Sequence, residues 1–255
     1  MSTKVVGRGG IALSFGGNLL GRTFPLPSFT LRFEFSDGSY SPLNSTWSKG
    51  SWTKVQGSAT NRWDWTYENT NWLNAFENKF TNQNNLVKVV ESNTTGVLKT
   101  FGMFDGCTAL TDVCYMDVSA TTDTRHMFSR CTSLRTSGVY NTSNSIDISY
   151  MYDGCSSLLA APPLRTNRVY DALATFRNCT SITRVPLMSF PIVVNVDGMY
   201  WNCINVESGA LDLYNHLLPR ESDIGHSSTF YNCGSNTATG RAELAKIPAN
   251  WKRKE

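Results

Sequence analysis

The sequence predicts a mixed β/α fold, a solenoid of about seven 24-residue coils, each with a short parallel strand and a helical turn, preceded by an N-terminal antiparallel β domain. Three observations lead to this prediction. Cysteines recur every 24 residues, an aromatic residue stands three places before each of them, and an aliphatic residue stands three places after. A unit of this length cannot bury its own apolar side, whereas stacked coils would share one continuous core.

The cysteine and aromatic columns are the predicted core of the stack. Both columns continue after a 30-residue interval near the end of the chain, which indicates one repeat with an insertion. We expect the thiols to be buried and reduced, because they pack as small apolar groups. The predicted structural core ladder consists of Cys107, Cys131, Cys155, Cys179, Cys203, Cys233, Phe104, Phe128, Tyr152, Phe176, Tyr200 and Phe230.

Each repeat is expected to contain a strand and a turn. Apolar residues follow the first cysteine at offsets 3, 6 and 8, as Leu110, Val113 and Tyr115, which is typical of a short strand entered through a turn. The segments before the cysteines, such as 123–129 and 147–153, predict a single α-helical or 3₁₀ turn that delivers an aromatic side chain inward.

Residues 1–68 have a different composition and predict a β-rich attachment or capping domain. In the segment 29–35, apolar Phe29, Leu31, Phe33 and Phe35 alternate with polar residues, the period of a half-buried strand. The pair Asp37-Gly38 then signals a hairpin. Open ends of stacked repeats need such a cap.

The repeat region is predicted to span residues 69–236, and residues 237–255 to form a C-terminal cap. Thr70 is a candidate helix N-cap, and Leu73, Phe76 and Phe80 follow at helical spacing, so we expect a short helix to enter the first coil. The segment 241–247 predicts a last short helix, with Trp251 covering the final coil.

The repeated motif resembles the BspA-like leucine-rich repeat surface proteins, whose repeats follow the pattern Met-Phe-x-x-Cys-Ser/Thr-x-Leu. The resemblance covers about residues 80–233. It implies a leucine-rich-repeat-like solenoid and an adhesive role at bacterial surfaces, or a place in the virions of phages that infect such bacteria. The matching segments are MFDGCTAL, MFSRCTSL, MYDGCSSL, TFRNCTSI and MYWNCINV.

Catalytic and metal chemistry is not predicted, and no cofactor is expected. The seven cysteines include no close pair of the kind that binds zinc, and the three histidines, His126, His216 and His226, stand in no triad or ligand spacing. We expect the histidines to be solvated or in loops. Asp123, Asp147 and Asp171 recur at one repeat position, which favours capping of the following turn, the alternative being a carboxylate cluster for calcium or glycoside hydrolysis.

Four aromatic residues fall outside the core columns and are the candidate ligand-binding residues. A sugar or a protein would be their ligand, the alternative being that they shield the rim of the stack. They are Tyr140, Tyr150, Tyr170 and Trp201.

These observations predict a non-enzymatic virion structural or adhesion protein, such as a phage fibre, tail or capsid-decorating protein. The apolar run at residues 11–13 is too short for a signal peptide, so we expect assembly in the host cytoplasm without export. Other virion or surface-assembly subunits are the expected partners through residues 1–68, with a homo-oligomer and a host-surface glycan or protein as further partners. The net charge of +3 predicts no nucleic-acid binding, and no apolar run predicts membrane insertion. The alternatives are a bacterial cell-surface adhesin and a glycan depolymerase.

Overall fold

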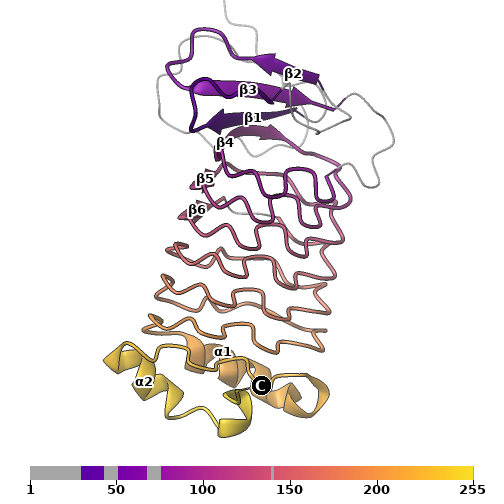
Figure 1. The fold of residues 1–255 in the computed structure, drawn as a ribbon. Coiled ribbons are helices and arrows are strands. Elements are labelled where there is room, and N and C mark those ends of the chain that lie inside the picture. Colours follow the sequence, from indigo (N-terminus) through magenta and orange to yellow (C-terminus); the bar gives the residue numbers. More distant parts are fainter. Residues whose placement is uncertain (1–29, 43–50, 68–75, 139–140, 255) are drawn as a thin grey trace, which may run out of the picture.

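The computed structural model describes residues 30–42, 51–67, 76–138 and 141–254, and its largest element is one open sheet of six strands. The strand order is β2-β3-β1-β4-β5-β6 (Figure 1). The strands β2, β3, β1 and β4 pair antiparallel, and β4, β5 and β6 pair parallel. Their bounds are β1 Thr30–Phe35, β2 Ser51–Lys54, β3 Asn61–Thr66, β4 Leu86–Asn93, β5 Asp112–Val113 and β6 Thr136–Ser137.

The alternation in β1 places one side of this strand in the core, as the sequence predicts. Leu31, Phe33 and Phe35 are buried, and Trp63 and Trp65 of β3 lie on the same face of the sheet. On the other face, polar side chains pair across the strands. The guanidinium of Arg32 in β1 bonds both Asp64 of β3 and Glu91 of β4, each at 2.7 Å, which ties three strands together.

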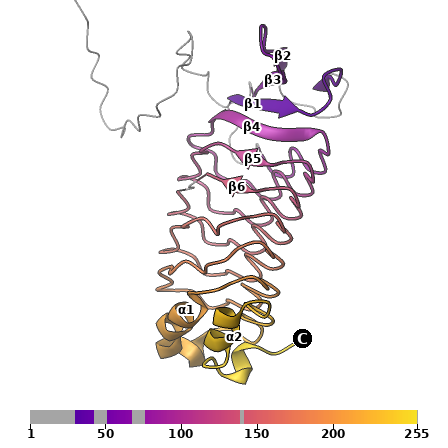
Figure 2. The same cartoon turned by 90° about the vertical axis from the view of Figure 1, so that its left-hand side faces the viewer.

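Helices are confined to the C-terminal part of the described chain. They are α1 Ala210–Leu217, the 3₁₀ segment η3 Leu218–Asp223, α2 Ala238–Leu244 and the 3₁₀ segment η4 Ala249–Trp251. They close the lower end of the molecule, opposite the antiparallel strands (Figure 2). Trp251 is fully buried there, and its carbonyl accepts a 3.0 Å bond from Phe230 N–H. None of the described helices has the length and apolarity needed to cross a membrane.

The predicted leucine-rich-repeat-like solenoid, with a strand and a helical turn in each coil, is wrong. The structure is mostly sheet, and the segments before the cysteines are turns without helical structure. The physical reason is that two residues of such a segment lie in the left-handed region, for example His126 (φ 54°) and Arg130 (φ 60°). A left-handed residue ends a helix, so two of them four residues apart prevent one.

The backbone groups of these turn segments bond sideways to the segment 23 residues further along the chain. Phe104 N–H donates to Met127 C=O at 2.8 Å, and Phe128 N–H donates to Met151 C=O at 2.9 Å. The regular parallel strands stop at β6, because the next segment contains Pro162 and Pro163, which have no N–H to donate. The result is a stack of irregular turns that carries β4, β5 and β6 on one side and continues below the sheet; we call it the turn stack, residues 76–138 and 141–233 without α1 and η3 (Figure 1).

The helix predicted to enter the first coil is absent from the described part of its segment, which begins at residue 76. Thr70 and Leu73 lie outside the described residues, and Phe76 to Phe80 form turns. The C-terminal helix predicted at 241–247 is present but begins and ends about one turn earlier, as α2. The domain boundaries at 68/69 and 236/237 stay predictions.

Candidate functional site

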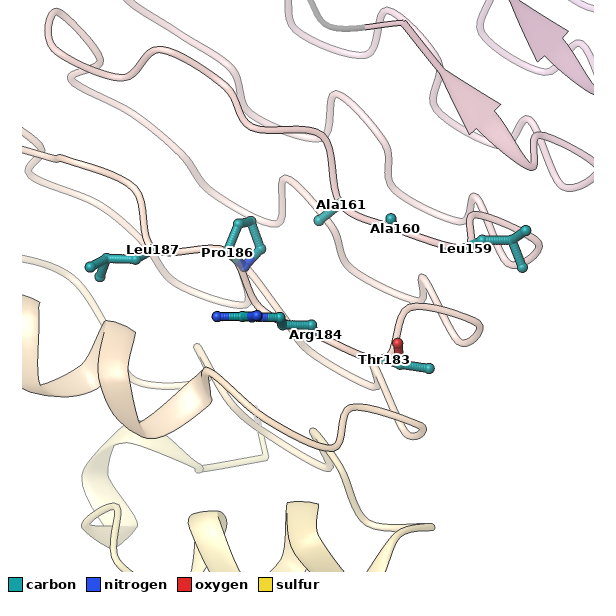
Figure 3. A pocket seen from close by; sticks show the side chains of 7 residues that line it. All are labelled: Leu159, Ala160, Ala161, Thr183, Arg184, Pro186 and Leu187. Atoms are coloured by element: carbon teal, nitrogen blue, oxygen red, sulfur yellow. The ribbon is translucent and has the colours of Figure 1, made fainter.

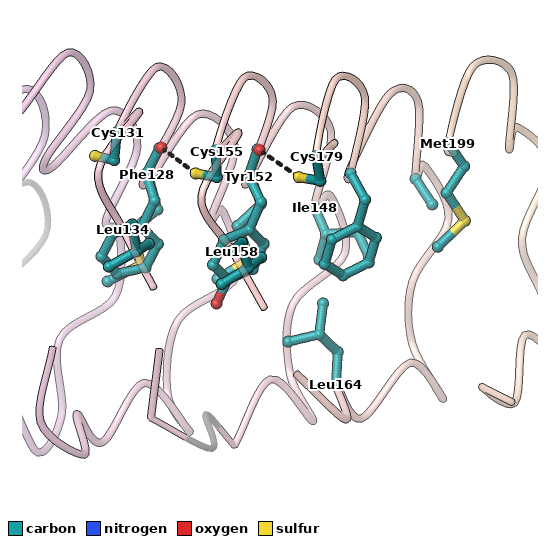
Figure 4. Close-up of a cluster of buried hydrophobic side chains, with 14 of the residues drawn as sticks. Phe128, Cys131, Leu134, Ile148, Tyr152, Cys155, Leu158, Leu164, Cys179 and Met199 are labelled. Carbon is teal, nitrogen blue, oxygen red and sulfur yellow. Dashed lines mark hydrogen bonds between the residues drawn. The ribbon is translucent and has the colours of Figure 1, made fainter. Parts of the chain in front are cut away.

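The twelve residues of the predicted core ladder form the interior of the turn stack and are all buried. The six rings stack in order along it, from Phe104 to Phe230, with neighbouring centroids 5.3–6.4 Å apart. Beside the rings, the five thiols from Cys107 to Cys203 each donate to the carbonyl oxygen 27 residues earlier, as from Cys155 to Phe128 and from Cys179 to Tyr152, both at 3.1 Å (Figure 4). These residues are structural, because they are buried and pack against one another inside the stack.

Burial makes the thiols poor nucleophiles. Desolvation raises the pKa of Cys107 to about 12 and that of the half-buried Cys114 to about 11, and it raises the pKa of Cys155 well above its usual value. All seven cysteines are free. Since the thiolate is the reactive form, these side chains are protonated packing groups at neutral pH.

The aspartate column is occupied by local hydrogen bonds. Asp123, Asp147 and Asp171 each accept the backbone N–H two residues further on, at 3.2, 2.9 and 2.9 Å, in agreement with the predicted capping role. Arg125 also lies within 2.7 Å of Asp123 and 3.6 Å of Asp147. In the described ranges, no three His, Cys, Asp or Glu side chains are grouped so that they could hold a metal ion.

A second set of side chains, five aromatic rings and one arginine, lies outside the core ladder, two to six residues before successive cysteines. All of them are half-buried, and they follow one edge of the turn stack. We call this set the aromatic edge; it consists of Phe101, His126, Tyr150, Arg177, Trp201 and Tyr231.

Ring and guanidinium contacts join the members of the aromatic edge. His126 stacks on Tyr150 with a centroid separation of 4.8 Å. The guanidinium of Arg177 lies over the ring of Tyr150 at 5.2 Å and over the ring of Trp201 at 6.0 Å. Trp201 then contacts Tyr231 edge to face at 5.6 Å. The six residues therefore form one continuous surface across neighbouring turns.

Polar groups hold Arg177 in this position. Its Nε and Nη2 donate to the two carboxylate oxygens of Asp153, at 2.9 and 2.7 Å. A column of side-chain amides continues beside it, since Asn202 donates to Asn178 at 3.1 Å and Asn232 donates to Asn202 at 2.7 Å. A bidentate pair fixes the plane of a guanidinium, so this part of the surface is preorganised.

Two members of the aromatic edge occupy backbone positions that suit glycine. His126 and Tyr150 have φ values of 54° and 57°, and the equivalent position is glycine in two other repeats, Gly102 and Gly198, and asparagine or alanine in two more, Asn78 and Ala174. A non-glycine residue in the left-handed region costs roughly 1 kcal/mol, and more for bulky side chains. The buried Ala174 has the same backbone conformation, so this conformation belongs to the turn, and the side chain at the position varies from one repeat to the next.

The four predicted ligand-binding aromatics are separated by the structure. Tyr150 and Trp201 both contact Arg177 in the aromatic edge. Tyr170 is 54% exposed, but it lies nine residues before its cysteine, and no ring contact joins it to the edge among the described residues. Tyr140 lies outside the described residues.

The positions of the histidines agree with the expectation that they are solvated or in loops, since His126 lies in a turn and His226 in a loop. Only His216, in α1, is exposed. His126 is half-buried against Tyr150, and desolvation lowers its pKa. His226 stacks on Trp251 at 4.1 Å in the C-terminal cap.

Sequence reasoning missed Arg177, Phe101, Tyr231 and the amide column. The signal was available for the amides, because Asn178 and Asn202 precede their cysteines directly and repeat at the 24-residue period. Asparagine recurring where other repeats have glycine indicates a left-handed position whose side chain points outward. No comparable signal exists for Arg177, since none of the other turns has an arginine at this position.

Comparison with known protein families supports part of the resemblance drawn from the sequence. Residues 51–162 match the family described as Mycoplasma protein of unknown function, DUF285. This match supports a relationship to a BspA-related family. The comparisons with curated proteins and with solved structures gave no match.

Proposed function

We propose that the protein is a non-enzymatic adhesion or virion structural protein that recognises a host-surface glycan or protein through the aromatic edge. The observation that carries this proposal is the unbroken run of ring and guanidinium contacts along the aromatic edge, from Phe101 through His126 and Tyr150 to Tyr231. Four of the six edge residues, Tyr150, Trp201, Tyr231 and Arg177, are of the three residue types that dominate binding energy at protein interfaces.

The test is a screen of glycan and protein arrays with the wild type, followed by matched variants. The double variant Tyr150→Gly/Trp201→Ala should bind the identified ligand at least tenfold more weakly. The control variant Tyr170→Ser, which removes an exposed tyrosine outside the edge, should bind as the wild type does. Equal binding by the edge variant and the wild type would contradict the proposal.

Attachment to other subunits is assigned to residues 1–68 in this proposal. In support, β2 is the terminal strand of the sheet, and edge strands are the places where another chain can pair. The seven free thiols support folding in a reducing compartment, as a phage protein made in host cytoplasm would do. Cryo-electron microscopy of native particles should place residues 1–68 against neighbouring subunits, with the turn stack projecting outward. A free monomer in such preparations would contradict a virion role.

A bacterial cell-surface adhesin is the second candidate, favoured by the match to a Mycoplasma family. Mass spectrometry of native material distinguishes its compartment, because an exposed surface protein would be recovered from the cell envelope. The glycan depolymerase remains the enzymatic alternative. If the bound glycan were cleaved by the wild type and not by a folded Asp123→Asn variant, the non-enzymatic proposal would be wrong.

A further inference from the structure

A column of backbone hydrogen bonds on the strand side of the turn stack breaks between two neighbouring turns. Four residues after the cysteines, Arg135 N–H donates to Thr111 C=O at 2.9 Å and Leu159 N–H donates to Arg135 C=O at 3.2 Å. Lower in the stack, Glu207 N–H donates to Thr183 C=O at 2.7 Å. Within the described chain, no bond joins Thr183 to Leu159, so these two turns are separated at this position.

The sequence explains this separation. The segment after Leu159 continues with Ala160, Ala161 and two prolines, and the turn below it contains Pro186. Prolines cannot donate to a ladder and restrict the residue before them, while the two alanines fill little space. A hollow of about 300 Å³ therefore opens between the two turns.

The side chains around this hollow combine apolar surface with hydrogen-bond donors. Leu159 and Leu187 stand at its two ends and are 51% and 65% exposed (Figure 3). Arg184 lies between them with its guanidinium extended toward Leu187, and Thr183 lies nearer Leu159 (Figure 3). In the parts of the chain that the structure describes, the guanidinium of Arg184 has no carboxylate partner, unlike Arg125, Arg130 and Arg177 on the other edge.

We infer that this hollow binds a carboxylate attached to a small apolar body. The guanidinium of Arg184 offers a planar pair of donors that matches a carboxylate. The leucines cover an aliphatic or aromatic side chain next to that carboxylate. Both the C-terminal residue of a peptide and a free N-acylated amino acid have this chemistry. The inference is independent of the function proposed for the aromatic edge.

The experiment is a titration followed through the methyl signals of Ala160, Ala161, Leu159 and Leu187 by nuclear magnetic resonance. N-acetyl-leucine should shift these signals with a dissociation constant of about 1 mM, as expected for so small a ligand. N-acetyl-leucinamide, which has the same body without the charge, should bind at least tenfold more weakly. A pentapeptide ending in leucine identifies the source, since tighter binding than N-acetyl-leucine indicates a peptide end and equal binding indicates a small acid.

Variants distinguish a site from general charge attraction. Arg184→Gln should weaken binding of N-acetyl-leucine at least tenfold, and Arg184→Lys should weaken it less. Arg168→Gln is the matched control, because Arg168 is an exposed arginine that does not line the hollow. Its Nη1 donates to Asn144 Oδ1 at 2.9 Å. Equal binding of the acid and the amide, unchanged binding by Arg184→Gln, or no methyl shift at tens of millimolar would each overturn the inference.

Discussion

The imidazole of His126 and the phenol of Tyr150 stack with their planes 6° from parallel, although both residues have left-handed backbone. The two residues are 24 positions apart in the sequence and belong to successive turns. Their contact extends the stacking of the interior onto the outer edge. Substitutions in these two adjacent sets of rings can therefore test stability and the proposed ligand recognition separately.

Replacing Tyr150 should weaken ligand binding with little effect on stability, whereas replacing Tyr152 should lower stability strongly. Tyr150→Gly removes a left-handed penalty of roughly 1 kcal/mol along with two ring contacts, so the free energy of unfolding should change by less than about 1 kcal/mol while ligand binding falls. Tyr152→Ala opens a cavity in the core ladder and should cost about 3–5 kcal/mol. Urea unfolding of both variants measures the difference, and a large loss in Tyr150→Gly would show that the edge is structural.

Stability should depend on pH through His126. Burial lowers the pKa of His126 in the folded protein, so the unfolded chain binds more protons as pH falls below about 6.5. Its contribution to stability is therefore complete above that pH and is lost towards pH 5. The nearby charges are Asp105 and Asp153, which raise this pKa, and Arg125 and Arg130, which lower it.

The measurement is the free energy of unfolding at pH 8 and pH 5 for the wild type and His126→Asn, since asparagine tolerates left-handed backbone. The variant should lose less stability on acidification than the wild type. His216→Asn, at an exposed position of α1, is the control and should behave as the wild type does. An equal loss in all three proteins would refute a role for His126.

The ion pair of Arg177 should matter more than that of Arg130. Both arginines contact an aspartate bidentately, but the Arg130 side chain is 61% exposed and that of Arg177 is 32% exposed. Asp153→Asn should cost about 1–2 kcal/mol and loosen Arg177, whereas Asp105→Asn should cost about 0–1 kcal/mol. Thermal unfolding compares the two, and equal shifts would mean that the exposure of the arginine does not determine the effect.

The thiols should be inaccessible until the protein unfolds. N-ethylmaleimide should label few of the cysteines in the native protein, with the half-buried Cys114 first, and all seven in guanidinium chloride. Cys155→Ala should cost about 1–2 kcal/mol through lost packing and a lost hydrogen bond. Rapid native labelling of Cys155 would contradict the buried ladder.

The interior could be predicted from the sequence more fully than the backbone could. The cysteine column that contains Cys155 and the aromatic column that contains Phe176 are recognisable because both recur in successive turns. The helical turns were predicted wrongly because the left-handed positions are filled by His126 and Tyr150 in two repeats, and neither residue signals a helix end. Similarly, Arg177 and Arg184 gain their roles from neighbours in adjacent turns, which the order of residues along the chain does not reveal.

The even spacing of the core rings also bears on how such a molecule can change its size. Each ring between Phe104 and Tyr200 meets the same kind of neighbour above and below, about 5.4 Å away. Removal or duplication of one 24-residue unit would reconnect equivalent positions and leave both ends closed. The distance between the sheet and the C-terminal helices can therefore be adjusted in whole layers, and the outward-facing edge grows or shrinks by the same step.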